Sequence, residues 1–550
     1  MMKTKILLLV LFIAVAFSAF GGGESESSVN AADAELVNPK GVYPIAKEKV
    51  TVSIFSHWNS RKMENPMTQW VADELNIEVE WAIQTREGLD DKFNVKMAAD
   101  NLDDITQFYG LAGSLYGGLE AVEDGYFYPI SDLFNEYGDA IPQWMNAEAD
   151  MWEITRASDG KFYSVPGRPI AFDDQFKTRI LIEQTWLDRL GLDMPTTTEE
   201  YFDVLVAFRD NDANGNGDPN DEFPLVASTT RPFLDFQSPL FGAFLDNFDW
   251  LHIKNGQVYN VATTEAFREA LRFMNRLWEE GLVHPASMSQ HRNDVRAMND
   301  ANDYTVVGST LGQHEGYVGA PGGDTWQAYN YLPPLEGPGG INITWRAPKN
   351  LASLGTGIGA KTEVPAVAFR FLDWLSSEEG HLAKYWGIEG THYRESKPGE
   401  LNVAGEQATW TEIVENREPE WGWGHLGVIW GGTGLFHDTL RAVVKTPETV
   451  NVSGMTPDEM IYKTSVEYLK HVDSLDTIWP ANIIFPPAVR TERAILGGNV
   501  NGLIYESGSK FVTGDLDLDA DWAEFQGQLE AAGLERYLQI CQEAWEARNK

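Results

Sequence analysis

The sequence predicts an α/β protein of two lobes, each an open, mostly parallel sheet flanked by helices, with a hinge between the lobes. Three observations support this prediction. The chain has 550 residues, more than one compact domain usually holds. Hydrophobic residues make up 43% of it, which is enough to fill large cores. Near the N-terminus, β-branched runs alternate with amphipathic segments, which is the order of a doubly wound parallel sheet.

The first lobe is expected to open with three strands separated by two helices. Short runs rich in β-branched and aromatic residues favour the strands, and apolar residues at helical spacing favour the helices. Polar and aromatic residues follow directly after the first run, where open α/β sheets place their ligands. The expected strands are 50–55, 77–83 and 104–108, and the expected helices are 65–75 and 89–99.

The second lobe is expected to begin with a strand near 178–182. A helix containing Trp186 follows and breaks at Gly191. Thr196, Thr197 and Thr198 are candidate caps of the next amphipathic helix, with Glu199 and Glu200 placed for its first turn. The later elements expected are a helix at 264–280, a strand at 304–309, crossing or sheet segments at 342–348 and 353–360, and a helix at 365–377.

An acidic, Gly-rich loop at 210–222 gives the sharpest chemical pattern in the chain. Calcium takes six to eight oxygen ligands, which alternate residues of a tight loop can supply. Two frames fit such a loop, and a solvated acidic turn is the alternative. The first frame uses Asp210, Asp212, Asn214, Asn216, Asp218 and Asp221, with Gly215 at the turn. The second uses Asp212, Asn214, Asn216, Asp218 and Asn220, with Gly217 at the turn and Asp221 and Glu222 closing the shell.

Several segments resemble one known family in the same order along the chain. They include NVKMAADNLDDIT (94–106), DGKFYSVPG (159–167), TWLDRLGLDMPTT (185–197) and DANGNGDPNDEFPL (212–225). The sequence resembles the family 1 extracellular solute-binding proteins, the long oligosaccharide-binding proteins of bacterial ABC importers. The resemblance implies a type II-like periplasmic-binding-protein fold, an oligosaccharide ligand, permease subunits as partners and a monomeric chain. It also implies a structural Ca²⁺ in the second frame of the loop.

The chain is expected to divide into segments with different roles. A signal peptide is expected at 1–20 and a flexible tether at 21–45. The first lobe is expected to comprise 46–168 plus 342–385, and the second lobe 169–341 plus 386–550.

The N-terminus predicts export to an extracytoplasmic location. Lys3 and Lys5 precede an apolar run, and small residues follow it, as in a secretory signal peptide. Members of the family usually carry a lipidated cysteine just after such a run, whereas this chain has Phe20 there. Its one cysteine is Cys541, so neither a lipid anchor nor an intrachain disulfide is expected.

Charge and motif content argue against several classes of function. The formal net charge is −40, from 42 basic and 82 acidic residues, so nucleic acid is not an expected partner. The chain contains no Walker A motif, no G-x-S-x-G and no H-E-x-x-H. Acidic residues are so numerous that a pair at glycosidase spacing carries no weight.

The tryptophan distribution points to sugar binding. Aromatic rings bury the flat C–H faces of sugars, and neighbouring polar groups bind the hydroxyls. Four of the singled-out tryptophans lie in Gly-rich sequence or at the end of a β-like run, and one follows the first strand; each could equally be a buried anchor. The candidate ligand-binding residues are Trp58, Asn59, Trp345, Arg346, Trp421, Trp423 and Trp430.

These observations predict the extracytoplasmic substrate-binding component of an ABC transporter, closing around an oligosaccharide between two lobes, rather than an enzyme. Trp58 and the pair Trp421 and Trp423 are expected on opposite lobes, so that rings from both sides sandwich the sugar. A secreted glycoside hydrolase or lyase is one alternative. A surface protein that binds glycans without a transport role is the other.

Overall fold

The computed structural model describes most of the chain between residues 31 and 548. The described residues are 31–57, 65–84, 88–107, 125–147, 152, 156–157, 160–165, 176, 178–230, 232–234, 238–245, 250–320, 323–346, 355–413, 421, 423, 440–472, 479, 483 and 485–548.

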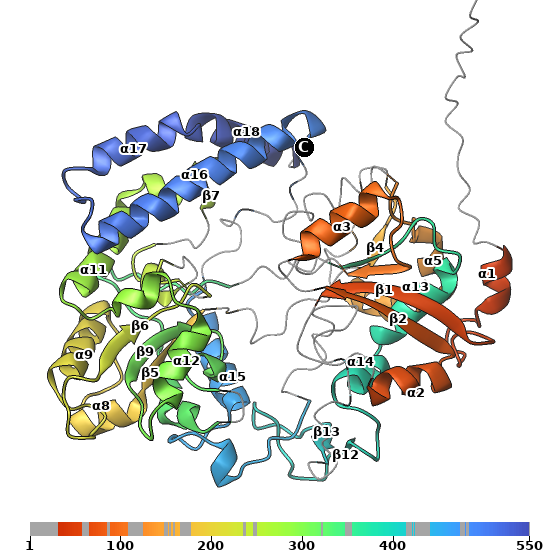
Figure 1. Ribbon diagram of the computed structural model, residues 1–550, viewed down its shortest axis with the longest axis horizontal. Coiled ribbons are helices and arrows are strands. Elements are labelled where there is room, and N and C mark those ends of the chain that lie inside the picture. Colours follow the sequence, from red (N-terminus) through yellow and green to blue (C-terminus); the bar gives the residue numbers. More distant parts are fainter. Residues whose placement is uncertain are drawn as a thin grey trace, which may run out of the picture.

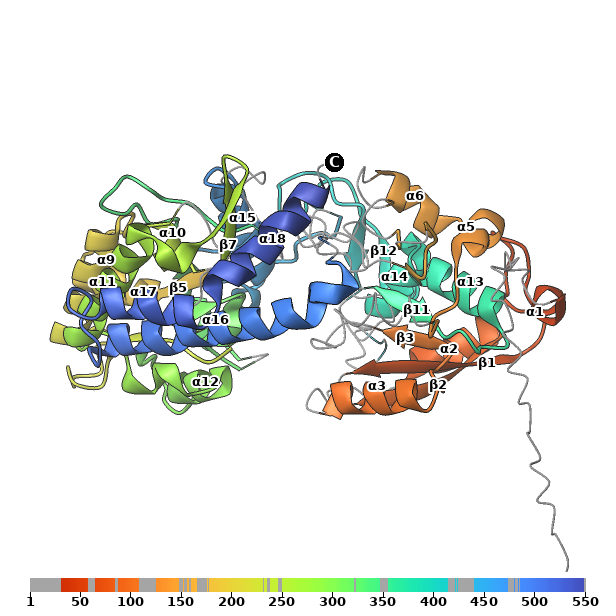
Figure 2. The same cartoon turned by 90° about the horizontal axis from the view of Figure 1, so that it is seen from above.

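Two lobes lie side by side, each with its own sheet and its own hydrophobic core (Figures 1 and 2). The first lobe comprises strands β1 (Val50–His57), β2 (Ile77–Gln84), β3 (Ile105–Gln107), β4 (Ser164–Val165) and β11 (Thr356–Ile358). Its helices are α1 (Ala31–Leu36), α2 (Pro66–Glu74), α3 (Leu89–Ala98), α5 (Ser131–Tyr137), α6 (Ala140–Ala147), α13 (Pro365–Leu375) and α14 (Glu378–Tyr385). The predicted α/β architecture is confirmed.

The first-lobe sheet has five strands in the order β2-β1-β3-β11-β4. β1 runs parallel to both of its neighbours, with Val50 opposite Ile77 and Ile54 opposite Ile105. Its inward-facing residues Val52 and Ile54 are fully buried, as a central strand between two helical layers requires. The three strands and two helices predicted for this region are confirmed.

The second lobe has a four-stranded sheet in the order β10-β5-β9-β6. Its strands are β5 (Arg179–Glu183), β6 (Phe223–Val226), β9 (Val307–Gly312) and β10 (Tyr329–Tyr331). The helices of this lobe are α8 (Gln184–Leu190), α9 (Thr198–Asp210), α10 (Pro239–Gly242), α11 (Glu265–Glu279), α12 (Arg292–Asp300), α15 (Pro457–Leu469), α16 (Pro487–Thr513), α17 (Trp522–Ala531) and α18 (Leu534–Arg548). The strand predicted at 304–309 begins later, at Val307.

Two small antiparallel sheets complete the described fold. The first is the hairpin of β7 (Leu251–Lys254) and β8 (Gln257–Asn260) in the second lobe. The second pairs β12 (Tyr393–Glu395) with β13 (Trp410–Glu412) and lies below the space between the lobes in Figure 1.

Local sequence explains how α8 and α9 are separated. α8 ends at Gly191, whose φ of 67° lies in the left-handed region that glycine enters without strain. α9 begins with a capping box, in which Thr197 accepts from the backbone N–H of Glu200 and the Glu200 carboxylate accepts from Thr197. These two signals confirm the predicted break and the predicted cap.

The sheets are mixed, whereas the sequence predicted them to be mostly parallel. β11 is antiparallel to both β3 and β4, and in the second lobe only β6 and β9 run parallel. The reason is the path of the chain. A segment that returns from the other lobe enters a sheet at the edge where its earlier strands end, so it must run in the opposite direction.

The segment 31–45, predicted to belong to a flexible tether, is part of the first lobe. Val37, Ile45 and Ala46 are buried in its core, and α1 packs against α13. The fully buried carboxylate of Asp33 accepts the backbone N–H groups of Ala366, at 2.5 Å, and of Val367, at 3.4 Å. The prediction failed because composition alone does not reveal that a distant helix needs these acceptors at its first turn.

Two lobe boundaries also differ from the prediction. Thr344 was assigned to the first lobe, but its N–H and hydroxyl donate to the carbonyls of His471 and Tyr468 in the second, at 3.0 and 2.6 Å. In the opposite sense, Trp421 and Trp423 were assigned to the second lobe but lie in the core of the first. The chain therefore passes between the lobes again after α14.

Candidate ligand-binding cleft and calcium loop

The two crossings between β4 and β5 and between Thr344 and β11 fix which edge of each sheet faces the other lobe. In the first lobe, Thr356 at the start of β11 lies opposite both Gln107, the last residue of β3, and Val165, the last residue of β4. Both crossings are therefore attached at the edge where the parallel strands β1, β2 and β3 end.

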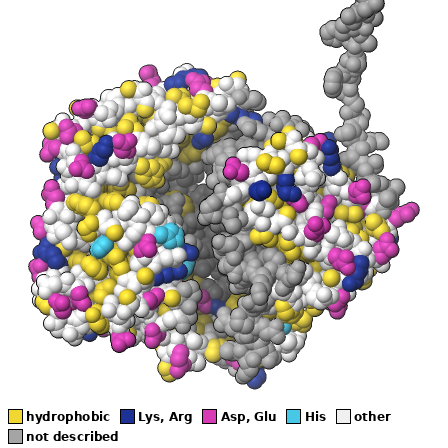
Figure 3. All heavy atoms as spheres, viewed as in Figure 1, with side chains coloured by type: hydrophobic (Ala, Val, Ile, Leu, Met, Phe, Trp, Pro, Cys, Tyr) yellow, Lys and Arg dark blue, Asp and Glu magenta, His cyan; other side chains and the backbone are white. Residues whose placement is uncertain are grey.

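The second lobe shows the same relation. The crossing from the first lobe enters at Arg179, which lies opposite Gly312, the last residue of β9. β6 runs parallel to β9 and ends at the same edge. The carboxyl ends of parallel strands from both lobes thus face each other, which is where open α/β sheets bind ligands. Figure 3 shows the surface hollowed between the lobes.

Two of the predicted ligand-binding residues follow the end of β1 at this edge. β1 ends at His57, and Trp58 and Asn59 come next in the sequence but lie outside the described residues, as does Trp430. Their contact with a ligand stays a prediction. Ser56 and Gln107, which the sequence analysis did not single out, lie at the same strand ends, are buried and hydrogen-bond to each other. Their position at strand ends is the feature that could have identified them.

Trp345 and Arg346 lie where the chain leaves the second lobe. They follow Thr344, which is bonded to the second lobe, and precede the crossing to β11. Both side chains are partly buried, and burial lowers the pKa of the Arg346 guanidinium because it removes water from the charge. Their place at a crossing is compatible with ligand contact, which remains a prediction.

Trp421 and Trp423 do not face a cleft from the second lobe, as was predicted. The Trp423 ring is fully buried and packs edge-on against Trp81 at 5.0 Å, and its Nε1–H donates to the Thr68 hydroxyl at 3.0 Å. The Trp421 Nε1–H donates to the carbonyl of Ala383 at 2.8 Å. Both rings are buried, and protein acceptors already satisfy their indole N–H groups. Glycine-rich sequence therefore did not indicate an exposed ring here.

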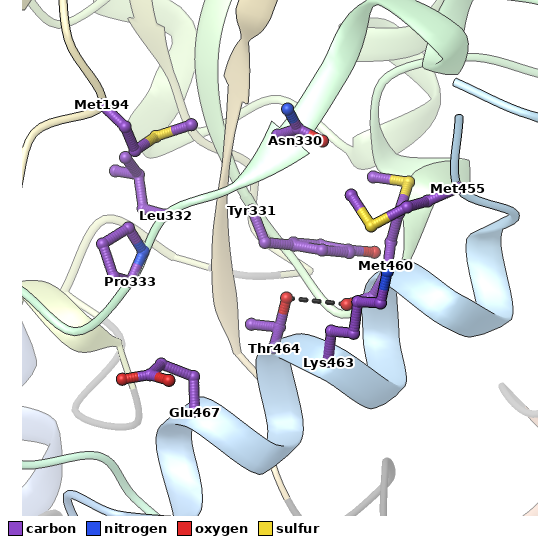
Figure 4. Close-up of a pocket in the computed structure, with 10 residues that line it drawn as sticks. All are labelled: Met194, Asn330, Tyr331, Leu332, Pro333, Met455, Met460, Lys463, Thr464 and Glu467. Carbon is purple, nitrogen blue, oxygen red and sulfur yellow. Dashed lines mark hydrogen bonds between the residues drawn. The ribbon is translucent and has the colours of Figure 1, made fainter. Parts of the chain in front are cut away.

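A separate pocket of about 280 Å³ lies between β10 and α15 (Figure 4). Its walls are mainly apolar, and none of the predicted site residues lines it. An oligosaccharide site needs a longer groove with converging polar groups, so we do not assign the ligand to this pocket. The lining residues are Met194, Asn330, Tyr331, Leu332, Pro333, Met455, Met460, Lys463, Thr464 and Glu467.

The acidic loop after α9 folds into successive turns that alternate side chains close by hydrogen bonds to the backbone. The side-chain oxygens of Asn214, Asn216 and Asp218 each accept the backbone N–H two residues further on, at 2.9, 2.7 and 3.1 Å. The Asp221 carboxylate accepts from the amide groups of Asn214 and Asn216. This alternation is the arrangement in which a loop can present oxygens to one hard cation.

The geometry distinguishes the two frames. In the second, Asp212 stands first and Gly217 sixth, and the Gly217 N–H donates to Asp212 Oδ2 at 2.9 Å while Gly217 adopts a φ of 96°. In the first, Asp210 stands first, but its carboxylate is paired with Arg209 at 2.7 Å. The second frame therefore suits the loop better.

Two carboxylate oxygens in this loop are buried without a hydrogen-bond partner. They are Asp212 Oδ1 and Glu222 Oε2. Burial raises the pKa of Glu222, and the neighbouring charge of Asp221 acts in the same direction, although backbone N–H donors oppose it. Buried anionic oxygens of this kind are costly unless a cation satisfies them. The donor set of this loop therefore fits calcium.

Too few carboxylates of this loop come together to bind a metal ion by themselves. Among the described residues, no group of three or more His, Cys, Asp or Glu side chains is arranged to hold a metal ion. A cation here would need the amide oxygens of Asn214 and Asn216 and backbone carbonyls as well. Such mixed oxygen donors are usual for calcium and unusual for transition metals.

The chain is similar in sequence and in fold to known proteins. No protein-family model matches the chain. It is 23% identical to the fructooligosaccharide ABC transporter substrate-binding protein FusA of Streptococcus pneumoniae, over 94% of each chain. An extracellular solute-binding protein from Bifidobacterium longum subsp. infantis matches with a TM-score of 0.68 and 20% identity, covering 91% of this chain and 99% of that one. The resemblance to solute-binding proteins and their fold is confirmed.

Two further solved structures bear on the acidic loop. FusA has been solved as an EF-hand mutant in complex with fructo-nystose, with 19% identity and a TM-score of 0.68 over 91% of this chain and 99% of that one. The alginate-binding protein AlgQ2 has been solved without calcium ion, with 18% identity and a TM-score of 0.62 over 92% of this chain and 100% of that one. An EF-hand is thus named for one of these binding proteins and a calcium ion for the other.

The burial of Trp423 generates a prediction opposite to a sugar-stacking role. Trp423→Ala should lower the free energy of unfolding by roughly 3–5 kcal/mol, because it removes a fully buried ring and leaves a cavity. Urea denaturation of the variant and of wild type measures the change. Trp423→Phe, which keeps part of the ring volume, should lose less. Unchanged stability in the Ala variant would show that the ring is not a core residue.

Proposed function

We propose that this chain is the extracytoplasmic substrate-binding component of an ABC importer, which closes its two lobes around an oligosaccharide. The observation that carries the proposal is the pair of strand-end edges that face each other across the hollow between the lobes (Figure 3). The similarity to FusA over 94% of both chains supports the same function.

The mechanism needs no change of covalent bonds. A ligand that contacts both edges has a higher affinity for the closed arrangement than for the open one, so its binding shifts the population toward closure. Trp345 and Arg346, at a crossing between the lobes, and Trp58, Asn59 and Trp430 are the proposed contacts. The closed monomer then presents the sugar to the permease subunits, which would distinguish it from the open form by shape.

The function is tested by titrating purified neutral and acidic oligosaccharides into the protein by calorimetry. A binding sugar should reduce the radius of gyration in X-ray scattering and remain chemically intact. Trp345→Ala should weaken binding by roughly 1–3 kcal/mol if the ring stacks on the sugar, whereas Trp345→Phe should retain most of the affinity. Appearance of cleavage products would identify an enzyme instead. Binding without closure would contradict the transport mechanism.

We also propose that the loop holds a structural Ca²⁺ in the second frame, with Asp212, Asn214, Asn216, Asp218 and Glu222 as ligands and Asp221 supporting the amides. The support is the pair of unsatisfied buried oxygens and the turn at Gly217. When bound, the ion would neutralise the loop and fix the connection between α9 and β6. It would take no part in sugar chemistry.

Calcium should therefore raise the unfolding temperature, and a chelator should lower it. With a Kd on the order of 1 μM, about 1 mM calcium stabilises by roughly 4 kcal/mol. Asp212→Ala should abolish the difference between calcium and chelator, measured by differential scanning calorimetry. Asp210→Ala is the matched control and should retain it, because Asp210 is paired with Arg209. Equal loss in both variants would favour the first frame, and no calcium effect in wild type would exclude the site.

Export is the remaining part of the proposal. Among the described residues no helix is long and apolar enough to span a membrane. The N-terminal 30 residues, which hold the expected signal peptide, lie outside the described part of the chain. Mass spectrometry of protein from its native host should show loss of an N-terminal segment and no attached diacylglyceryl group, because position 20 is Phe. An intact Met1 or a lipid adduct would contradict this.

A further inference from the structure

A cluster of basic side chains lies at the edge of the second lobe that faces the first. The cluster comprises Arg292 and Arg296 of α12 and His314, which follows the end of β9; we refer to it as the basic cluster. β9 ends at the edge where the chain enters from the first lobe. On the face shown in Figure 3, His and Lys or Arg side chains gather on the second lobe at the border of the hollow.

The ring of Tyr317 contacts two members of the basic cluster. Its ring is buried, with 3% exposure, and lies against Gly312, where an added Cβ would come within 2.7 Å of Tyr317 Cβ. The Arg292 guanidinium lies over this ring, 5.4 Å from its centroid, and the His314 ring packs edge-on against it at 5.2 Å. The ring thus holds two cationic or potentially cationic groups in place.

Arg296 is held next to Gly316, the residue that precedes Tyr317. Its Nε–H donates to the carbonyl of Gly316, and its Nη1 donates to Asn293 at 3.3 Å. A Cβ on Gly316 would lie 3.0 Å from Arg296 Nη2 and 2.8 Å from the His314 ring. The guanidinium and the imidazole therefore converge on Gly316, and only glycine leaves room for both.

The two arginines of the basic cluster have no carboxylate partner in the part of the chain that the structure describes. Acidic residues outnumber basic ones by 82 to 42, and several described arginines pair with carboxylates, as Arg276 does with Glu199 at 2.7 Å. Among the described residues, no carboxylate lies within ion-pair distance of Arg292 or Arg296. The buried Arg292 Nε also has no hydrogen-bond partner.

The lowered pKa of Arg296 agrees with the lack of a carboxylate partner. Its pKa is lowered, first by burial and then by the charge of Arg292, while Tyr317, Asp300 and Glu315 oppose the shift. Asp300 is engaged elsewhere, since its carboxylate accepts from the Ala320 N–H at 3.0 Å and the Thr325 hydroxyl at 2.9 Å. An anion bound between the two guanidinium groups would relieve their repulsion.

We propose that the basic cluster is an anion subsite of the cleft, at which Arg292 and Arg296 bind the carboxylate of a uronic acid residue in the oligosaccharide. The inference rests on the proposed function and narrows its ligand to acidic sugars. Guanidinium groups suit this role because they bind a carboxylate through two parallel N–H donors. Tyr317 is a positioning residue that fixes Arg292, and His314 borders the subsite.

The test compares acidic oligosaccharides with their neutral counterparts. Oligomers of galacturonate, glucuronate and mannuronate are titrated calorimetrically beside the same oligomers reduced at the carboxyl groups, with a sulfated oligosaccharide as a separate arm. The wild-type protein should prefer one acidic oligomer over its reduced form by roughly tenfold or more. Arg292→Gln and Arg296→Gln should each remove most of that preference while leaving affinity for the reduced form unchanged. Arg276→Gln is the matched control and should retain the preference.

The outcomes separate the two proposals. Binding of neutral oligosaccharides with equal or weaker affinity for acidic ones would overturn the anion subsite and leave the proposed function standing. Stronger binding of the sulfated oligomer than of any uronate would also overturn it. No binding to any oligosaccharide would remove the proposed function, and the subsite with it.

A ligand-free measurement distinguishes a binding role from a structural one. Because no carboxylate pairs with Arg292, Arg292→Gln should lower the unfolding temperature only slightly, through loss of the contact with the Tyr317 ring. A marked fall in that temperature, with acidic and neutral sugars weakened equally, would show that Arg292 only supports the fold and would overturn the proposal.

Discussion

The constraint on which this structure depends is that the chain crosses between its lobes at the strand ends. β5 must begin where β9 ends, and β11 must begin where β3 and β4 end, because the crossings join the two sheets at those edges. This single requirement explains the mixed sheets, places the two edges opposite each other and creates the space between them. Strand ends from segments far apart in the sequence, such as Gln107 in β3 and Gly312 in β9, thereby come to lie at the two facing edges.

Two tryptophans that the sequence placed in the cleft are core residues whose polar atoms are satisfied within the protein. Trp421 and Trp423 each find a protein acceptor for the indole N–H, so their burial carries no unpaired donor. Tyr317 is buried as well, yet a guanidinium lies over its ring without a carboxylate partner. The contrast separates rings that complete the packing of a lobe from a ring that holds a charged group at the edge of the cleft.

Charge is distributed unevenly over this acidic chain. The loop after α9 buries anionic oxygens, of Asp212 and Glu222, that are left without donors, whereas the edge beside β9 holds cations that lack carboxylates. The acidic loop lacks a cation and the edge beside β9 lacks an anion. A bound cation would therefore stabilise the loop, and a bound anion would stabilise the edge. The overall charge of −40 indicates neither site, since it averages over both.

The sequence by itself determined the local elements and the chemistry of the acidic loop. The capping box at Thr197, the break at Gly191 and the turn at Gly217 follow from short-range sterics and hydrogen bonds, which neighbouring residues specify. Only the tertiary structure decided that Trp423 is core, because its contacts come from chain segments far away in sequence. The pairing of Arg292 with a ring beyond β9 depends in the same way on packing, which local sequence does not encode.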